Sequence, residues 1–140
     1  MKIRVSEVMT CGVETIGPAA TLEAAATKMK AHNVGILPVV EDEELIGVLT
    51  DRDIVLRAVS MRMRPEMTRV REVMTRNAIY CYADQDVTEA SLLMEKNLVH
   101  RLIVLDRSEK LVGIVSLSDL AAKTKSAALA GHVLAEVSAA

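Results

Sequence analysis

Residues 45–56 read Leu-Ile-Gly-Val-Leu-Thr-Asp-Arg-Asp-Ile-Val-Leu, and this stretch decides the fold. Its first half is apolar and rich in branched residues, which is typical of a buried strand. After Thr50 the apolar residues recur at helical spacing, so a helix is predicted to begin there. Thr50 and Asp53 lie three residues apart, like the hydroxyl and the carboxylate of a capping box. The same place also suits a phosphate, because a helix N-terminus presents free N–H groups.

This pattern occurs twice in the chain. Residues 111–120 read Leu-Val-Gly-Ile-Val-Ser-Leu-Ser-Asp-Leu and align with residues 45–54 at a spacing of 66. Earlier in the chain, residues 4–10 match residues 69–75 at a spacing of 65, at all positions but one. The extra residue falls in a polar turn, where a surface loop tolerates an insertion. The chain is therefore predicted to be a tandem duplication.

Each repeat is predicted to form a β-α-β-β-α unit. In the first repeat we expect strands at 13–16, 36–40 and 45–50, with helices at 21–32 and after Thr50. The helix at 21–32 should have an apolar face made of Leu22, Ala25, Ala26 and Met29. In the second repeat we expect strands at 78–82, 101–105 and 111–116, with helices at 86–96 and after Ser116. Asp86 and Glu89 resemble a capping box at the start of the helix at 86–96. The predicted organisation is repeat 1 at 1–60, a linker at 61–68, repeat 2 at 69–122 and a helical tail at 123–140. Because one repeat buries its sheet poorly by itself, we expect the two to pack with pseudo-twofold symmetry around two equivalent clefts.

Composition argues against several classes of protein. A net charge of −2 and only two aromatic residues give no basis for binding nucleic acid in general. No uncharged apolar run approaches the roughly 20 residues that span a bilayer, and the N-terminus lacks a secretory pattern. We therefore expect a cytoplasmic protein without membrane contact. Cys11 and Cys81 are too few for a disulfide framework or a zinc site, so they are interpreted as reduced, mostly packed thiols.

Together these features resemble the tandem cystathionine-β-synthase (CBS) domain pair, or Bateman module. The resemblance covers roughly residues 3–122. It rests on two Val-Met-Thr segments, Leu-Pro-Val-Val at 37–40, Arg-Leu-Ile-Val-Leu-Asp at 101–106, and two Gly-x-hydrophobic-[Ser/Thr]-x-x-Asp segments. It implies a mixed α/β (α+β) fold of two repeats. It also implies an adenosyl ligand in the clefts (AMP, ADP, ATP or S-adenosylmethionine), a homodimer, and regulation of a separate protein partner.

The repeated acidic position is the strongest candidate for ligand binding. Asp53 and Asp119 resemble the family's ribose-binding aspartate, and an ionised carboxylate can accept both hydroxyls of a ribose. Arg52 could reach a phosphate, or it could be an ordinary solvated arginine. Thr50, Ser116 and Ser118 carry hydroxyls that could donate a hydrogen bond to a phosphate. Alternatively, these hydroxyls could only cap a helix.

A cationic pair distinguishes the second repeat. His100 and Arg101 precede a strand and resemble a repeat of the AMP-activated kinase regulatory subunit, where these positions face phosphate. Arginine suits phosphate through its planar fork. The matching residues of the first repeat are Gly35 and Ile36, so a phosphorylated ligand is expected to prefer the second site. The family's short adenine-recognising strand corresponds to Val13 in repeat 1 and to Ala78, Ile79 and Tyr80 in repeat 2.

Three functions remain open at this stage. The favoured one is a regulatory module that senses adenine nucleotides, with no catalytic cofactor. A small enzyme is disfavoured, because the chain has no P-loop lysine, nucleophile elbow or metal-ligand cluster in its sequence. The alternatives are a ligand-independent dimeric scaffold, with redox or metal sensing through the cysteines as a variant, and a sensor of S-adenosylmethionine or NAD.

Overall fold

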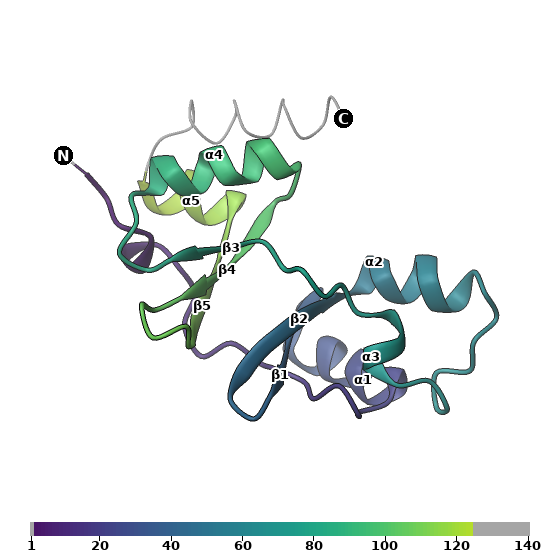
Figure 1. Cartoon of the computed structure of the whole chain (residues 1–140). Coiled ribbons are helices and arrows are strands. Elements are labelled where there is room, and N and C mark those ends of the chain that lie inside the picture. The colour runs from purple at the N-terminus through teal and green to yellow at the C-terminus, as the bar shows by residue number, and fades with distance from the viewer. Residues whose placement is uncertain (1, 125–140) are drawn as a thin grey trace. The chain divides into compact units, whose positions relative to one another are not determined.

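The computed structural model describes residues 2–124 and contains two compact units (Figure 1). Within the described residues, unit 1 consists of residues 2–13 and 79–124, and unit 2 of residues 14–78. Each unit thus takes its leading segment from the other sequence repeat. Backbone hydrogen bonds explain this exchange, because Val5 N donates to Gln85 O at 2.8 Å and Val70 N donates to Ala20 O at 2.8 Å. The mixed α/β fold of two repeats is confirmed. The predicted bounds of the repeats follow the duplication in the sequence, and they differ from the bounds of the two compact units.

Unit 2 is built on a β-hairpin. It contains α1 (Leu22–His32), β1 (Ile36–Glu41), β2 (Glu44–Thr50), α2 (Asp51–Asp53), η2 (Ile54–Val59) and α3 (Val70–Val73). The first helix begins and ends as predicted, because Thr21 Oγ1 accepts from Ala24 N at 3.1 Å and Asn33 ends it with φ 52°. The predicted strand at 13–16 was too long, since only Ile16 pairs, in parallel, with Val39.

The core of unit 2 is aliphatic. Leu22, Ala25 and Met29 of α1 are buried as their spacing predicted, against Leu37 and Val39 of β1 and Leu49 of β2. Ala26, which the sequence placed on the same face, is exposed. The buried stripe of α1 is therefore one residue narrower than expected, and the prediction was wrong for Ala26.

The second helix of unit 2 departs from α-helical geometry. Ile54–Val59 forms a π-helix, in which Ser60 N donates to Val55 O at 3.1 Å, five residues back. This wider winding turns Ala58 into the core and leaves Val55 and Val59 54% and 62% exposed. The sequence predicted an α-helical apolar face here, and that prediction was wrong for these two valines. π-Helical turns are rare and are frequently found at functional sites.

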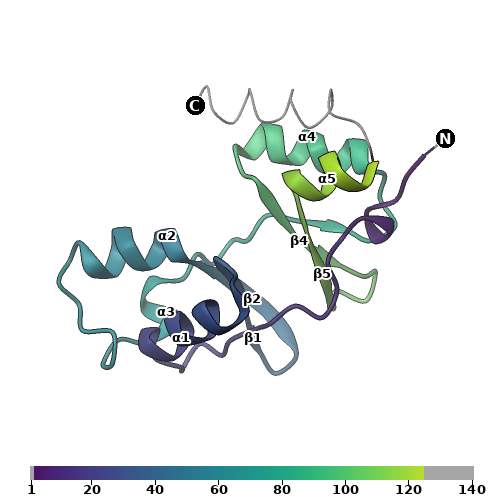
Figure 2. The ribbon, with the colours of Figure 1, turned by 180° about the vertical axis from the view of Figure 1, so that it is seen from behind.

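Unit 1 has a three-stranded sheet with helices on one face (Figures 1 and 2). Its elements are η1 (Val5–Glu7), β3 (Tyr80–Tyr82), α4 (Val87–Asn97), β4 (Arg101–Leu105), β5 (Leu111–Ser116) and α5 (Leu117–Thr124). Strand β4 is central, parallel to β3 and antiparallel to β5. Helices α4 and α5 cover one face, and their buried residues include Met94 and Leu120. The predicted strand at 78–82 shortens to its last three residues.

Each sheet contains one glycine that allows a neighbouring segment of the chain to approach closely. Thr75 forms two backbone hydrogen bonds with Val48 of β2, of 2.8 and 2.9 Å, and Thr10 pairs in the same way with Ile114 of β5. A Cβ on Gly47 would lie 2.4 Å from Thr75 O, and one on Gly113 would lie 2.8 Å from Thr10 O. The glycine of the repeated motif is therefore explained by the close approach of the Val-Met-Thr segment.

Residues 125–140, and with them most of the predicted helical tail, lie outside the described part of the chain. Within residues 2–124, no helix is long and apolar enough to cross a membrane.

Candidate functional site

In unit 2, strand pairing gathers the predicted ligand-binding residues at one end of the hairpin. Ile36, the first residue of β1, pairs with Thr50, the last of β2. Gly35 O accepts a hydrogen bond from Asp51 N at 2.9 Å, which holds the start of α2 beside the start of β1. We call this group the unit 2 rim; it consists of Gly35, Ile36, Thr50, Asp51, Arg52 and Asp53.

A closed capping box fixes Asp53. Thr50 Oγ1 accepts from Asp53 N at 3.0 Å, and Asp53 Oδ2 accepts from Thr50 N at 3.0 Å. The predicted structural role of this pair is therefore confirmed. One carboxylate oxygen is therefore held by an amide at the end of the strand, and the other oxygen is directed elsewhere.

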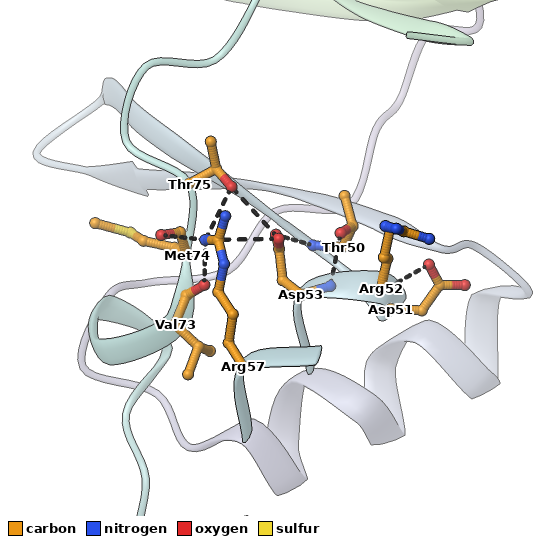
Figure 3. Close-up of polar contacts among 8 residues, drawn as sticks. All are labelled: Thr50, Asp51, Arg52, Asp53, Arg57, Val73, Met74 and Thr75. Atoms are coloured by element: carbon orange, nitrogen blue, oxygen red, sulfur yellow. Dashed lines mark hydrogen bonds and ion pairs between the residues drawn. The ribbon is translucent and has the colours of Figure 1, made fainter. Parts of the chain in front are cut away.

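The second oxygen of Asp53 faces the segment that follows α3 (Figure 3). Thr75 Oγ1 donates to Asp53 Oδ1 at 3.4 Å, and Arg57 Nη1 lies 3.6 Å from the same oxygen. The Asp53 side chain is only 12% exposed. Neither Arg57 nor Thr75 was predicted from the sequence to be part of a site. Thr75 belongs to the repeated Val-Met-Thr segment, which is the signal that could have revealed it, whereas Arg57 has Lys123 at its matching position and so carries no repeat signal.

Unit 1 repeats this arrangement with different residues. Arg101 pairs with Ser116 across β4 and β5, and His100 O accepts from Leu117 N at 2.8 Å. Ser116 Oγ accepts from Asp119 N at 3.1 Å, and Asp119 Oδ2 accepts from Ser116 N at 2.9 Å. We call this group the unit 1 rim; it consists of His100, Arg101, Ser116, Leu117, Ser118 and Asp119.

The hydroxyls and cations of the unit 1 rim are accessible. Ser116 Oγ and Ser118 Oγ lie 2.9 Å apart, so the two hydroxyls form one polar cluster beside the start of α5. His100, Arg101 and Ser118 are exposed, and Asp119 is half-buried. Hydroxyls, a helix start and an arginine fork are groups that bind a phosphate oxygen.

The predicted adenine-recognising residues divide into two groups. Ile79 O accepts from Ile103 N at 3.3 Å, which places Ile79 and Tyr80 beside the start of β4, at the same end of the sheet as Arg101. Tyr80 is 42% exposed. Val13 and Ala78 are half-buried. Val13 is the last residue of the first part of unit 1 and Ala78 is the last residue of unit 2, so neither belongs to the unit 1 rim or the unit 2 rim.

The two rims differ in charge. An added Cβ at residue 35 would come within 2.8 Å of Asp51 Oδ2, so the carboxylate of Asp51 occupies the space next to Gly35. In unit 1 the matching positions carry His100 and Leu117. The unit 2 rim thus has two carboxylates and Arg52, whereas the unit 1 rim has one carboxylate, Arg101 and an imidazole. An anionic group is favoured at the unit 1 rim.

The cysteines lie in different environments. Cys81 of β3 is buried, and burial raises the pKa of its thiol to about 12. Cys11 is exposed, so the expectation that both thiols are packed was wrong for Cys11. Within residues 2–124, neither cysteine belongs to a group of three or more His, Cys, Asp or Glu side chains that could hold a metal ion.

Comparison with known proteins identifies the family. The family model for the CBS domain matches residues 5–60 and 70–125. The chain therefore belongs to the CBS domain proteins and carries two copies in tandem. Among its relatives is YhcV of Bacillus subtilis strain 168, a CBS domain-containing protein that is 42% identical over 134 residues. The alignment covers 96% of this chain and 94% of YhcV, so the similarity is to a protein of the same extent and not to one part of a larger enzyme.

Two solved structures extend this comparison. The CBS domain protein TA0289 of Thermoplasma acidophilum superposes with a TM-score of 0.86 at 27% identity, over 97% of this chain and 76% of TA0289. The CBS domain pair of protein MJ0100 superposes with a TM-score of 0.79 at 25% identity, over 89% of this chain and 98% of that pair. The MJ0100 pair was solved in complex with 5′-methylthioadenosine and S-adenosyl-L-methionine.

Proposed function

We propose that this CBS pair is a regulatory module that binds an adenine nucleotide at its rims and acts on a separate protein partner. The observation that carries the proposal is the repeated capped aspartate, which stands beside exposed phosphate-binding groups in unit 1. Asp53 and Asp119 would accept ribose hydroxyls, while Arg101, Ser116 and Ser118 would hold a phosphate. The adenosyl ligands of the MJ0100 pair support this class of ligand. AMP, ADP and ATP are our first candidates, since each carries the phosphate that the unit 1 rim favours.

The first test is a thermal-shift panel with AMP, ADP, ATP, S-adenosylmethionine and NAD, followed by calorimetry. The protein should first be freed of any bound nucleotide. A ligand that binds only the folded state stabilises it by about 2.7 kcal/mol at 100 times its Kd. We expect at least one nucleotide to bind, and the Asp53→Asn/Asp119→Asn double variant to lose that binding. Asparagine can still accept the capping hydrogen bond, so this variant separates the loss of charge from the loss of the helix cap.

The phosphate role is tested with Arg101→Gln. Removing a charged hydrogen-bond donor costs about 1.5–3 kcal/mol, or roughly 10- to 100-fold in affinity for AMP. The affinity for adenosine should not change. Lys110→Gln, at an exposed position of the turn between β4 and β5, removes the same charge at the opposite end of these strands and should leave both affinities unchanged. Equal losses for adenosine and AMP in Arg101→Gln would refute a phosphate contact.

A sensor of S-adenosylmethionine is the second candidate, and the unit 2 rim favours it. The carboxylate of Asp51 suits the positively charged sulfonium of that ligand better than it suits a phosphate. In the same panel, S-adenosylmethionine binding that is lost in Asp51→Asn, with no response to AMP, would favour this reading. If only NAD stabilised the protein in this panel, an NAD sensor would replace both candidate functions.

Self-association is supported by an exposed apolar segment in unit 2. Val55, Leu56, Val59, Met61 and Met67 are each more than half exposed. Exposed apolar side chains that cluster in one segment mark interaction surfaces. We propose a homodimer through this segment, and we expect Val59→Glu/Met61→Glu to sediment as a monomer. A dimer that forms while no adenosyl ligand binds would instead support the ligand-independent scaffold. The cytoplasmic location stays a prediction.

A further inference from the structure

One arginine joins the predicted ribose site to the chain segment that leaves unit 2 (Figure 3). Arg57 Nη1 donates to Val73 O at 2.9 Å, to Met74 O at 3.2 Å and to Thr75 Oγ1 at 3.1 Å. The same nitrogen lies 3.6 Å from Asp53 Oδ1. The Arg57 side chain is half exposed, yet its guanidinium is directed inward over this group.

The contacts of Asp53 divide between its two oxygens. Oδ2 is committed to the capping box with Thr50. From the residues that the structure describes, Oδ1 receives only the long 3.4 Å hydrogen bond from Thr75 and the ion pair with Arg57. A carboxylate oxygen has two lone pairs, and Thr75 and Arg57 already contact Oδ1, so a further short hydrogen bond there would form at the expense of the long bond from Thr75. A ligand hydroxyl that donates to Oδ1 would compete with the weak Thr75 bond and not with the cap.

The segment held by Arg57 continues directly into the next unit. Thr75 pairs with Val48 on β2, Ala78 is the last residue of unit 2, and Ile79 is the first of the second part of unit 1. Arg57 is the only side chain among the described residues that is shown to contact both Asp53 and the Val73–Met74 carbonyls. A change at Asp53 therefore has a direct physical route to this connection.

We propose that Arg57 is a positioning residue: it aligns Asp53 Oδ1 for a ribose hydroxyl and couples occupancy of Asp53 to the Val73–Thr75 segment. This inference rests on the proposed nucleotide binding. The Arg57 guanidinium keeps the carboxylate turned toward Thr75 in the free protein. When a ribose hydroxyl donates to Oδ1, the Thr75 hydroxyl gives up its weak bond, and the segment loses one of the contacts that hold it.

The test compares two ligands that differ only in the ribose hydroxyls. AMP and 2′,3′-dideoxy-AMP are titrated into wild type, Arg57→Gln and Thr75→Val by calorimetry. In wild type, AMP should bind more tightly than the dideoxy ligand. In Arg57→Gln we expect the preference for AMP to fall by about tenfold, as for a misaligned charged hydrogen bond. In Thr75→Val the competing donor is absent, so the preference for AMP should rise.

Arg71→Gln is the matched control. It removes an exposed arginine of α3, just before the Val73–Thr75 segment, and should leave the preference for AMP unchanged. If Arg57→Gln weakens AMP and dideoxy-AMP equally, Arg57 is only structural and the inference is wrong. If wild type binds neither ligand, the proposed function fails and the inference falls with it. Should Arg57→Gln fold poorly, Thr75→Val still decides, since an unchanged preference there contradicts the competition at Oδ1.

Hydrogen exchange supplies a readout that does not depend on affinity. With saturating AMP, the amides of residues 73–78 should exchange faster in wild type than they do in the free protein. This difference should be absent with saturating dideoxy-AMP and in Thr75→Val. An AMP-bound protein with unchanged exchange in this segment would refute the coupling while leaving nucleotide binding intact.

Discussion

Gly47→Ala tests why the repeated motif contains a glycine. The added methyl group would lie 2.4 Å from Thr75 O and 3.3 Å from Arg76 Cα, far inside van der Waals contact. These atoms are backbone and cannot rotate away. The segment around Thr75 must therefore withdraw from β2, and the two hydrogen bonds it forms with Val48 lengthen or break.

The cost has two parts. Forcing a methyl group into a closely packed site typically costs about 1–3 kcal/mol. Two backbone hydrogen bonds contribute about 1 kcal/mol each. We therefore expect Gly47→Ala to lower the free energy of unfolding by roughly 3 kcal/mol or more.

Urea unfolding followed by circular dichroism measures this loss. Gly17→Ala is the control, because its Cβ would meet nothing within 4 Å, and it should leave stability unchanged or slightly raised. Gly113→Ala should fall between the two, since its nearest contacts, at 2.8 Å, include the flexible Met9 sulfur. If Gly47→Ala is as stable as Gly17→Ala, the close approach of Thr75 to β2 is not a feature of the folded protein.

Other parts of the fold give further predictions. Ellman's reagent should label the exposed Cys11 quickly in the folded protein, whereas Cys81, whose pKa burial raises to about 12, should react only after unfolding; two fast thiols would contradict this. Leu102→Ala should destabilise the protein by about 2–5 kcal/mol because Leu102 is fully buried, while Leu92→Ala, at an exposed position, should stay within about 0.5 kcal/mol of wild type in the same urea assay. The hydrogen bond from the Thr88 amide lowers the pKa of Asp86 in the folded state, so its stabilisation is present above the unfolded pKa of about 3.9 and is lost as pH falls through the lower folded value. Urea midpoints of wild type and Asp86→Asn should therefore converge below pH 4, and a difference that grows with acid would refute this.

Much of the fold was predictable because local patterns are repeated. The start of α1 at Thr21 and both capping boxes follow from short-range spacing, which the chain encodes directly. The predicted capping pair Asp86 and Glu89 was right only in part. Asp86 caps α4 by accepting from Thr88 N, but Glu89 accepts from the Gln85 side chain at 2.9 Å.

Predictions failed where a non-local partner decides. The strand at 13–16 reduces to Ile16 because only that residue meets β1, and the π-helical turns of η2 expose Val55 and Val59. Hydrophobic periodicity reflects the spacing of apolar residues within one element. It does not show which distant segment of the chain that element will contact.

The candidate site shows the same division. By itself, the sequence determined the two repeats, the aspartates with their caps and the cationic pair His100–Arg101, because each depends on residue type and short spacing. Only the tertiary structure decided that Thr75, 22 residues away along the chain, meets Asp53, whereas Arg57 lies four residues from Asp53, a short spacing that the sequence itself contains. The tertiary structure also decided that each unit takes its leading segment from the other repeat. The physical reason is that backbone pairing at the edge of a sheet depends on which segment can approach closely. The glycines at 47 and 113 permit that approach, but they do not specify which segment makes it.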